Sequence, residues 1–145
     1  MESKKPKLLM YEGIPGSGKS TLKQAVSKYR GHAHLSLDRF TPSMWVYSKF
    51  RNEIAYEFNE YVEKTLEDNF DVHVIWCICA ANIAYSRCLI KNDLEDAHFE
   101  RLCSLSNLYK EYFTTVTTYS KIIEVNTEKD ISICTAEIIN FVDSY

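Results

Sequence analysis

The stretch "GIPGSGKST" at residues 13–21 holds three of the four glycines in a chain of 145 residues. The fourth is Gly31, and no glycine follows it. The apolar segment "KLLMYEG" at residues 7–13 comes before, and apolar residues at helical spacing follow from Leu22 to Tyr29. A short apolar segment that ends in glycine indicates a buried strand, and Gly31 can end the helix. The sequence therefore predicts a strand, a glycine loop and a helix.

The spacing inside this loop is that of a phosphate-binding loop, with Gly13, four intervening residues, and then Gly18, Lys19 and Ser20. Glycines allow backbone amides to approach a phosphate, and the following helix adds its positive dipole end. In such loops the lysine reaches the β- and γ-phosphates, and the serine hydroxyl binds Mg²⁺. We therefore expect ATP and Mg²⁺ as cofactors, with ATP bound by Gly13, Ile14, Pro15, Gly16, Ser17, Gly18, Lys19, Ser20 and Thr21.

The rest of the chain alternates between apolar strands and amphipathic helices. Further strands are predicted at residues 33–40, 72–79 and 121–125, and helices at 99–113 and 131–142. Apolar residues recur every three or four positions from Tyr47 to Leu66, which predicts one long helix, bent near Arg51 and Asn52. This alternation predicts a three-layer α/β fold, in which helices cover both faces of a parallel sheet of about four strands. The length predicts a single domain over residues 1–145.

The composition is that of a soluble globular protein, with 46% apolar and 26% charged residues and a net charge of −3. The longest apolar run, at residues 72–81, is about half as long as a membrane span. The opening "MESKKPK" has charge without an apolar segment behind it, unlike a secretory signal. The five cysteines show no zinc-like spacing. We therefore expect a cytoplasmic protein with free thiols and no membrane partner.

Several classes of nucleotide-binding protein fit this sequence poorly. A GTPase switch needs a glycine after an aspartate to sense the γ-phosphate, yet no glycine follows Gly31. The segment "NTEKD" at residues 126–130 has the wrong order for guanine recognition, and the strand at 72–79 lacks the acidic pair of a motor. A small kinase remains, in which the acid comes from another strand.

The best acidic candidate is Asp38, near the end of the predicted second strand. Ligands of open parallel sheets bind beyond the carboxyl ends of the strands, so Asp38 should lie at the same edge as the glycine loop. A carboxylate there can hold a Mg²⁺-bound water or accept the proton of an attacking hydroxyl. Arg39 offers a planar fork for a phosphate. The alternative is an ordinary strand-end pair that faces solvent.

The segment "DRFTPSMWVYS" at residues 38–48 resembles a pattern of the thymidylate kinase and deoxynucleoside kinase family. Asp38, Arg39, Ser43 and Tyr47 fall in register, and Phe40 replaces a tyrosine. The segment "AANIAYSRCLIK" at residues 80–91 resembles the start of the family's lid helix. The resemblance implies a P-loop kinase fold and a nucleoside or nucleotide acceptor. It implies catalytic roles for Lys19, Asp38, Arg39 and Arg87, further ATP contacts from Arg87 and Lys91, acceptor contacts from Arg39, Phe40, Ser43 and Tyr47, and Mg²⁺ held by Ser20 and, through water, Asp38.

The sequence also departs from that family. The segment between Lys19 and Asp38 is too short for the strand and helices that grip the acceptor, and Ser48 replaces a glutamine. An open acceptor side favours either a homodimer or a larger acceptor, such as a hydroxyl of DNA on a modified base or a 5′ end. A basic track for DNA could combine Lys4, Lys5, Lys7, Lys49 and Arg51. The other alternative is a nucleotide-binding protein that transfers no phosphate.

Overall fold

The computed structural model describes residues 4–31, 33–53 and 56–144. In this part of the chain four parallel strands form one sheet in the order β2-β1-β3-β4. The strands are β1 (Lys7–Glu12), β2 (Leu35–Asp38), β3 (Asp71–Ile78) and β4 (Ile122–Asn126). β1 and β3 occupy the centre, and their almost continuous burial explains why they are apolar on both faces. The predicted α/β class and the small parallel sheet are confirmed.

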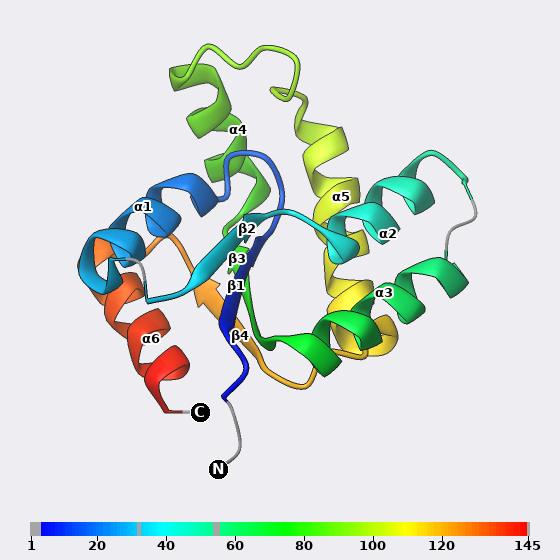
Figure 1. Cartoon of the computed structure of the whole chain (residues 1–145). Helices are drawn as coiled ribbons and strands as arrows, with labels where there is room; N and C mark the ends of the chain where they lie inside the picture. The colour runs from blue at the N-terminus through cyan, green and yellow to red at the C-terminus, as the bar shows by residue number, and fades with distance from the viewer. Residues whose placement is uncertain (1–3, 32, 54–55, 145) are drawn as a thin grey trace.

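Helices cover both faces of this sheet (Figure 1). One face carries α1 (Lys19–Arg30) and α6 (Ile131–Asp143), and the other carries α2 (Thr41–Phe50), α3 (Tyr56–Asn69) and α5 (Phe99–Glu111). A π-helical turn, η1 (Tyr112–Val116), continues α5. The remaining helix, α4 (Ala81–Ile90), stands beyond the carboxyl ends of the strands, next to the loop that follows β1. The three-layer arrangement therefore leaves that edge of the sheet for a functional site.

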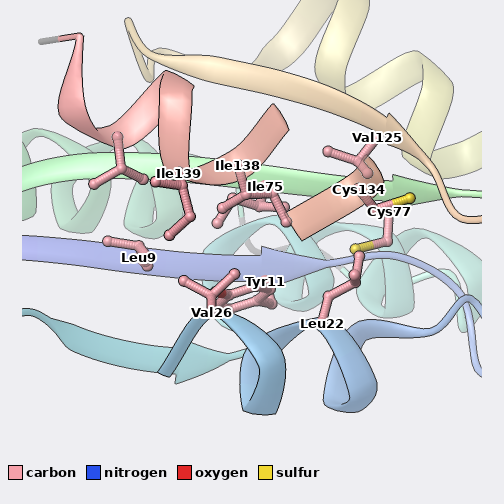
Figure 2. Close-up of a cluster of buried hydrophobic side chains, with 11 residues drawn as sticks. Leu9, Tyr11, Leu22, Val26, Ile75, Cys77, Val125, Cys134, Ile138 and Ile139 are labelled. Carbon is pink, nitrogen blue, oxygen red and sulfur yellow. The ribbon is translucent and has the colours of Figure 1, made fainter. Parts of the chain in front are cut away.

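Apolar side chains seal the sheet against its helices on both faces. Between the sheet and α1 and α6, Leu9 and Ile75 of the central strands meet Val26 and Ile138 (Figure 2). On the opposite face Trp45 of α2 packs in one cluster with Leu102 and Tyr109 of α5. Burial of these side chains supplies the main driving force for folding and fixes the strand ends relative to the helices.

The prediction of one continuous helix from Tyr47 to Leu66 is wrong, because the structure has two helices there, but the change of direction falls at Arg51 and Asn52, where the bend was predicted. α2 ends at Phe50, where the Arg51 and Glu53 amides still bond to the carbonyls of the preceding turn. Asn52 then adopts a left-handed conformation with φ 57°, which turns the chain away from the axis of α2. Residues 54 and 55 of the predicted helix lie outside the described residues.

Two sequence expectations about the surroundings of the protein can be compared with this fold. No helix in residues 4–31, 33–53 and 56–144 combines the length and the apolar character needed to span a bilayer. The five cysteines are free thiols, as expected, and Cys77, Cys88 and Cys134 are buried. Buried thiols of this kind pack as small apolar groups.

Candidate active site

The glycine loop, residues 13–18, connects the end of β1 to the start of α1 and lies tightly against its neighbours. A Cβ atom at Gly13 would lie 2.5 Å from the Cys77 carbonyl oxygen, and one at Gly16 would lie 2.4 Å from the Ala84 carbonyl oxygen. Both residues also have positive φ angles, at 146° and 78°. Any larger side chain would therefore collide with the backbone of β3 or α4, so the two glycines are required by packing.

Lys19, the first residue of α1, folds back over this loop. Its Nζ donates hydrogen bonds of 2.8 Å to the carbonyl oxygens of Gly13 and Ile14, and one of 3.3 Å to Ser17 Oγ. The side chain is almost fully buried, and this burial lowers the pKa of the Lys19 ammonium to about 8. The cation is therefore held at the loop, within reach of an anion that enters there.

Asp38 and Arg39 lie beside the glycine loop, because β2 pairs in parallel with β1. Asp38 is paired with Tyr11 in the sheet, and the Arg39 amide donates to the Tyr11 carbonyl at 2.9 Å. Arg39 has φ 63°, an uncommon conformation for a residue that is not glycine. Its guanidinium lies 5.8 Å from the centre of the Tyr47 ring, in cation–π contact. The turn after β2 thus presents Arg39 at the functional edge of the sheet.

These residues surround a polar cavity of about 280 Å³. It brings together side chains that the sequence singled out from three segments: Lys19 and Ser20 at the start of α1, Asp38 and Arg39 at the end of β2, and Lys91 at the end of α4. Asp93 and Asp96, from the acidic segment between α4 and α5, also line it. The lining residues are Pro15, Gly16, Gly18, Lys19, Ser20, Asp38, Arg39, Cys88, Lys91, Asp93 and Asp96.

A second cavity of about 240 Å³, here called the side cavity, lies on the α1 and α6 side of the loop. Arg87 stands at the boundary, donating to the Gly16 carbonyl at 3.2 Å, to Thr127 Oγ1 at 3.0 Å and to the Thr127 carbonyl at 2.8 Å. Thr127, in the turn after β4, is a site residue that sequence reasoning missed. The lining residues are Gly18, Thr21, Leu22, Arg87, Lys91, Thr127, Lys129, Ile131 and Cys134.

The structure also reveals a buried carboxyl that sequence reasoning missed. Glu12, the last residue of β1, is fully buried and accepts hydrogen bonds of 2.5 Å from the Phe40 amide and from Ser43 Oγ. The Ser43 hydroxyl lies 2.6 Å from the Tyr109 hydroxyl. Burial raises the pKa of Glu12 to about 7, against the lowering effect of these hydrogen bonds. The acid in "YEG" was the available signal, but its partners are distant in sequence.

The predicted acceptor residues take different positions around the polar cavity. Arg39 lines it, with Tyr47 beside the guanidinium. The Phe40 ring instead packs against the apolar cluster formed by Leu8, Met10, Val72, Val74 and Tyr119. Ser43 is buried against Glu12. Roles in acceptor binding therefore stay predictions for all four, and Arg39 and Tyr47 are the two whose placement favours such a role.

The expected basic track for DNA does not form as one surface. Lys7 begins β1, and its Nζ donates to the Val142 carbonyl near the end of α6. Lys5 donates to the Glu67 carbonyl in α3. Both lie at the amino edge of the sheet, opposite the polar cavity, whereas Lys49 and Arg51 lie at the end of α2. The start of β1 and the end of α2 lie far apart in Figure 1, so these cations do not form one continuous track.

Comparison with solved structures identifies this architecture. The YorR protein of Bacillus subtilis, solved with phosphorylated GDP, aligns with a TM-score of 0.73 and 18% identity over 94% of this chain and 95% of that one. Deoxyadenosine kinase of M. mycoides, solved with dCTP, aligns with a TM-score of 0.71 and 18% identity over 96% of this chain and all of that one. This is a P-loop kinase fold.

A second structure of the deoxyadenosine kinase is similarly distant in sequence. The same M. mycoides enzyme with dCMP and dCDP aligns with a TM-score of 0.69 at 16% identity, over 95% of this chain and all of that one. No protein-family model and no curated protein sequence matches the chain. At such low identities the P-loop kinase fold is shared, while the chemistry of this chain has to be argued from its own residues.

Proposed function

We propose that the protein is a single-domain intracellular kinase that transfers the γ-phosphoryl group of ATP to a nucleoside or nucleotide. The observation that carries the proposal is the polar cavity, where Lys19, Ser20, Asp38, Arg39 and Lys91 meet at the glycine loop. Three of these five side chains are cations, which suits a highly negative ligand. The P-loop kinase fold supports this assignment.

The two cavities offer places for the two ends of the donor. The triphosphate would lie in the polar cavity, where Lys19 can exchange its carbonyl partners for phosphate oxygens. The base would lie in the side cavity, between Leu22 and Ile131. Arg87, hydrogen-bonded between the glycine loop and Thr127, stands where the two cavities adjoin at Gly18 and Lys91. Its charge would stabilise the transferring phosphoryl group.

The residues present also suit Mg²⁺, the cofactor that kinases of this fold require. Ser20 and Asp38 line the same cavity, and together they offer the hydroxyl and carboxylate oxygens that this cation prefers. Ser20 would hold the ion directly and Asp38 through water. When bound, Mg²⁺ supplies positive charge that offsets the charge on the phosphate oxygens.

The reaction itself needs orientation more than covalent chemistry by the protein. An acceptor oxygen forms a bond to the γ-phosphorus while the bond from that phosphorus to the bridging oxygen breaks, leaving ADP. If the acceptor is a hydroxyl, its proton passes to Asp38. If it is a nucleotide, Arg39 binds its phosphate in a bidentate manner, with Tyr47 holding the guanidinium.

The test is transfer of label from γ-labelled ATP to a panel of nucleosides, nucleoside monophosphates and DNA with free 5′ or hydroxymethyl hydroxyls. We expect transfer to a free nucleoside or nucleotide, and loss of about a hundredfold or more in Lys19→Ala. Lys28→Ala, an exposed change on the same helix, is the matched control. Transfer to DNA alone would show that the acceptor is a polymer and not a free nucleoside or nucleotide. Wild-type turnover in Lys19→Ala would refute the kinase proposal.

A further inference from the structure

Glu12 has no part in the proposed transfer, yet it lies between the glycine loop and the turn that carries Asp38 and Arg39. The next residue, Gly13, begins the glycine loop, and the carboxyl of Glu12 faces the start of α2, directly after Asp38 and Arg39. The side chain is fully buried, so it cannot touch a nucleotide. A buried ionisable group in such a place has to be explained by what it holds.

The contacts of Glu12 fasten α2 to β1. One carboxyl oxygen accepts the Phe40 amide, which precedes the first turn of α2, and the other accepts the Ser43 hydroxyl within that turn. A carboxylate at this place satisfies the Phe40 amide, which the helix leaves unpaired, and complements the positive dipole end of α2. Ser43 extends the chain of hydrogen bonds to Tyr109 in α5. Three elements therefore converge on one carboxyl.

The residue fixed by this arrangement is Arg39. Its own amide is bonded to the Tyr11 carbonyl, and the amide of the next residue is bonded to Glu12. Its left-handed φ of 63° persists only if the surroundings hold it. We propose that Glu12 is a positioning residue, which keeps Arg39 at the polar cavity by anchoring Phe40 and Ser43. The inference rests on the proposed kinase function, because it assigns Arg39 to the reacting groups.

The ionised and protonated forms of Glu12 hold α2 differently. The ionised carboxylate accepts from both Phe40 and Ser43, which makes both hydrogen bonds charge-assisted. The protonated acid would donate to Ser43, and Ser43 would then donate to Tyr109, so that the bond to the Phe40 amide is to a neutral group. The ionised form therefore holds the start of α2 and Arg39 more firmly.

Burial and the charges around Glu12 together set the pH at which its carboxyl ionises. Lys19 faces it from the glycine loop and Arg39 from the turn after β2, and both cations favour ionisation. Tyr47, Tyr109 and Tyr119, from α2, α5 and the segment before β4, face it as neutral phenols. Burial outweighs the cations and brings the pKa to about 7. The contribution of Arg39 to kcat/KM for the acceptor should therefore increase as the pH rises through about 7.

The test compares Glu12→Gln with Glu63→Gln. Glu63 of α3 is a matched control, because it is also buried with a pKa raised to about 7, but it bonds to Thr118, before β4 at the opposite edge of the sheet. For Glu12→Gln we expect kcat/KM for the acceptor to fall by about tenfold or more, as when a charge-assisted hydrogen bond is lost, with KM for ATP within about twofold. The acidic limb of the acceptor profile near pH 7 should disappear in Glu12→Gln and persist in Glu63→Gln.

A measurement without turnover keeps this inference separate from the kinase proposal. In amide NMR spectra of the wild type, the Phe40 signal should shift with a midpoint near pH 7. The shift should be absent in folded Glu12→Gln and retained in Glu63→Gln. A Phe40 signal that does not titrate, or equal losses of acceptor kcat/KM in both variants, would overturn the positioning role. Absence of all phosphoryl transfer with a titrating Phe40 would instead refute the kinase function and leave the anchor intact.

Discussion

Arg87 and Thr127 join α4 to the turn after β4 by two hydrogen bonds, of 3.0 Å to the threonine hydroxyl and 2.8 Å to its carbonyl oxygen. A third bond from the same guanidinium, to the Gly16 carbonyl, includes the glycine loop. One planar side chain thus braces three segments around the side cavity. The fork geometry of arginine is what allows this, because a lysine ammonium at the same place could not span both oxygens and the loop.

Arg87→Lys should therefore weaken nucleotide binding although the charge is kept. We expect the Kd for ADP to increase by about tenfold, in line with the loss of hydrogen bonds to a charged group. Isothermal titration calorimetry would measure it. Arg30→Lys is the control, since Arg30 bonds to His34 and Asp143 near the far end of α1, and its Kd should stay within about twofold of the wild type. Equal weakening in both variants would contradict the bracing role.

Nucleotide binding should be coupled to proton uptake by Lys19. Burial lowers the pKa of this ammonium to about 8. A phosphate in contact would favour the charged form and raise that pKa, so the protein should take up a fraction of a proton between pH about 8 and 9. Calorimetry in buffers of different ionisation enthalpy measures this uptake. Lys19→Met should bind without it, whereas uptake that persists in Lys19→Met would assign the proton to another group.

Asp38 and Arg39 should contribute to different steps. Asp38→Asn should lower kcat for a hydroxyl acceptor by about a hundredfold while KM for ATP changes little, because a proton acceptor is lost. Arg39→Ala should raise KM for a nucleotide acceptor and spare KM for ATP, because a bidentate phosphate contact is lost. Steady-state kinetics with each substrate varied in turn would separate these effects. Changes confined to KM for ATP in both variants would contradict this division.

Gly31 and Gly16 both have positive φ, so alanine substitutions there compare backbone strain alone with backbone strain combined with a steric clash. Gly31→Ala should reduce stability by about 1–3 kcal/mol, since its Cβ would meet open space but its backbone, at φ 64° and ψ −126°, lies in a region that residues other than glycine rarely adopt. Gly16→Ala should cost more than about 3 kcal/mol, because its Cβ would also strike the backbone of α4. Urea denaturation measures both. Similar losses would mean that α4 moves aside to accept the methyl group.

Stability should depend on pH through the two buried glutamates. Burial raises the pKa of both Glu12 and Glu63 from 4.5 to about 7, so the folded state keeps protons that the unfolded chain releases. Their contribution to the free energy of unfolding is therefore full below pH 4.5 and lost as the pH rises to about 7. Glu12→Gln and Glu63→Gln should each flatten this fall in denaturation curves recorded across the range. An unchanged slope in both would show that neither carboxyl titrates as described.

The sequence was sufficient for those features that depend on local pattern. The strand, glycine loop and helix at the start of the chain were predicted because each residue there contributes to one backbone geometry. Asp38 and Lys19 were expected at the same edge because parallel strands share their carboxyl ends, and the polar cavity contains both. The sequence predicted the bend at Arg51 and Asn52 but not the separation of α2 from α3, because the apolar period continues past the change of direction at Asn52.

Features that depend on residues distant in sequence could not be predicted from the local pattern. Glu12 belongs to the apolar segment at residues 7–13, directly before the glycine loop, but its partners Phe40, Ser43 and Tyr109 come from two helical segments distant in sequence. Ser43 was assigned to the acceptor on the pattern of its neighbours, and no sequence signal shows that it is turned inward. Thr127 follows a short apolar strand and resembles any other turn residue until Arg87 reaches it.

The hydrogen bonds from Lys19 to the carbonyls of Gly13 and Ile14 have a consequence for ligand discovery. The ammonium keeps its positive charge while it donates to these two neutral oxygens, so a compound that binds at the loop has to offer Lys19 a better acceptor than a carbonyl. Anionic oxygens form the stronger, charge-assisted hydrogen bonds. Inhibitor libraries for this protein should therefore be enriched in compact anionic groups, such as carboxylates and phosphonates, and neutral compounds should compete poorly at this position.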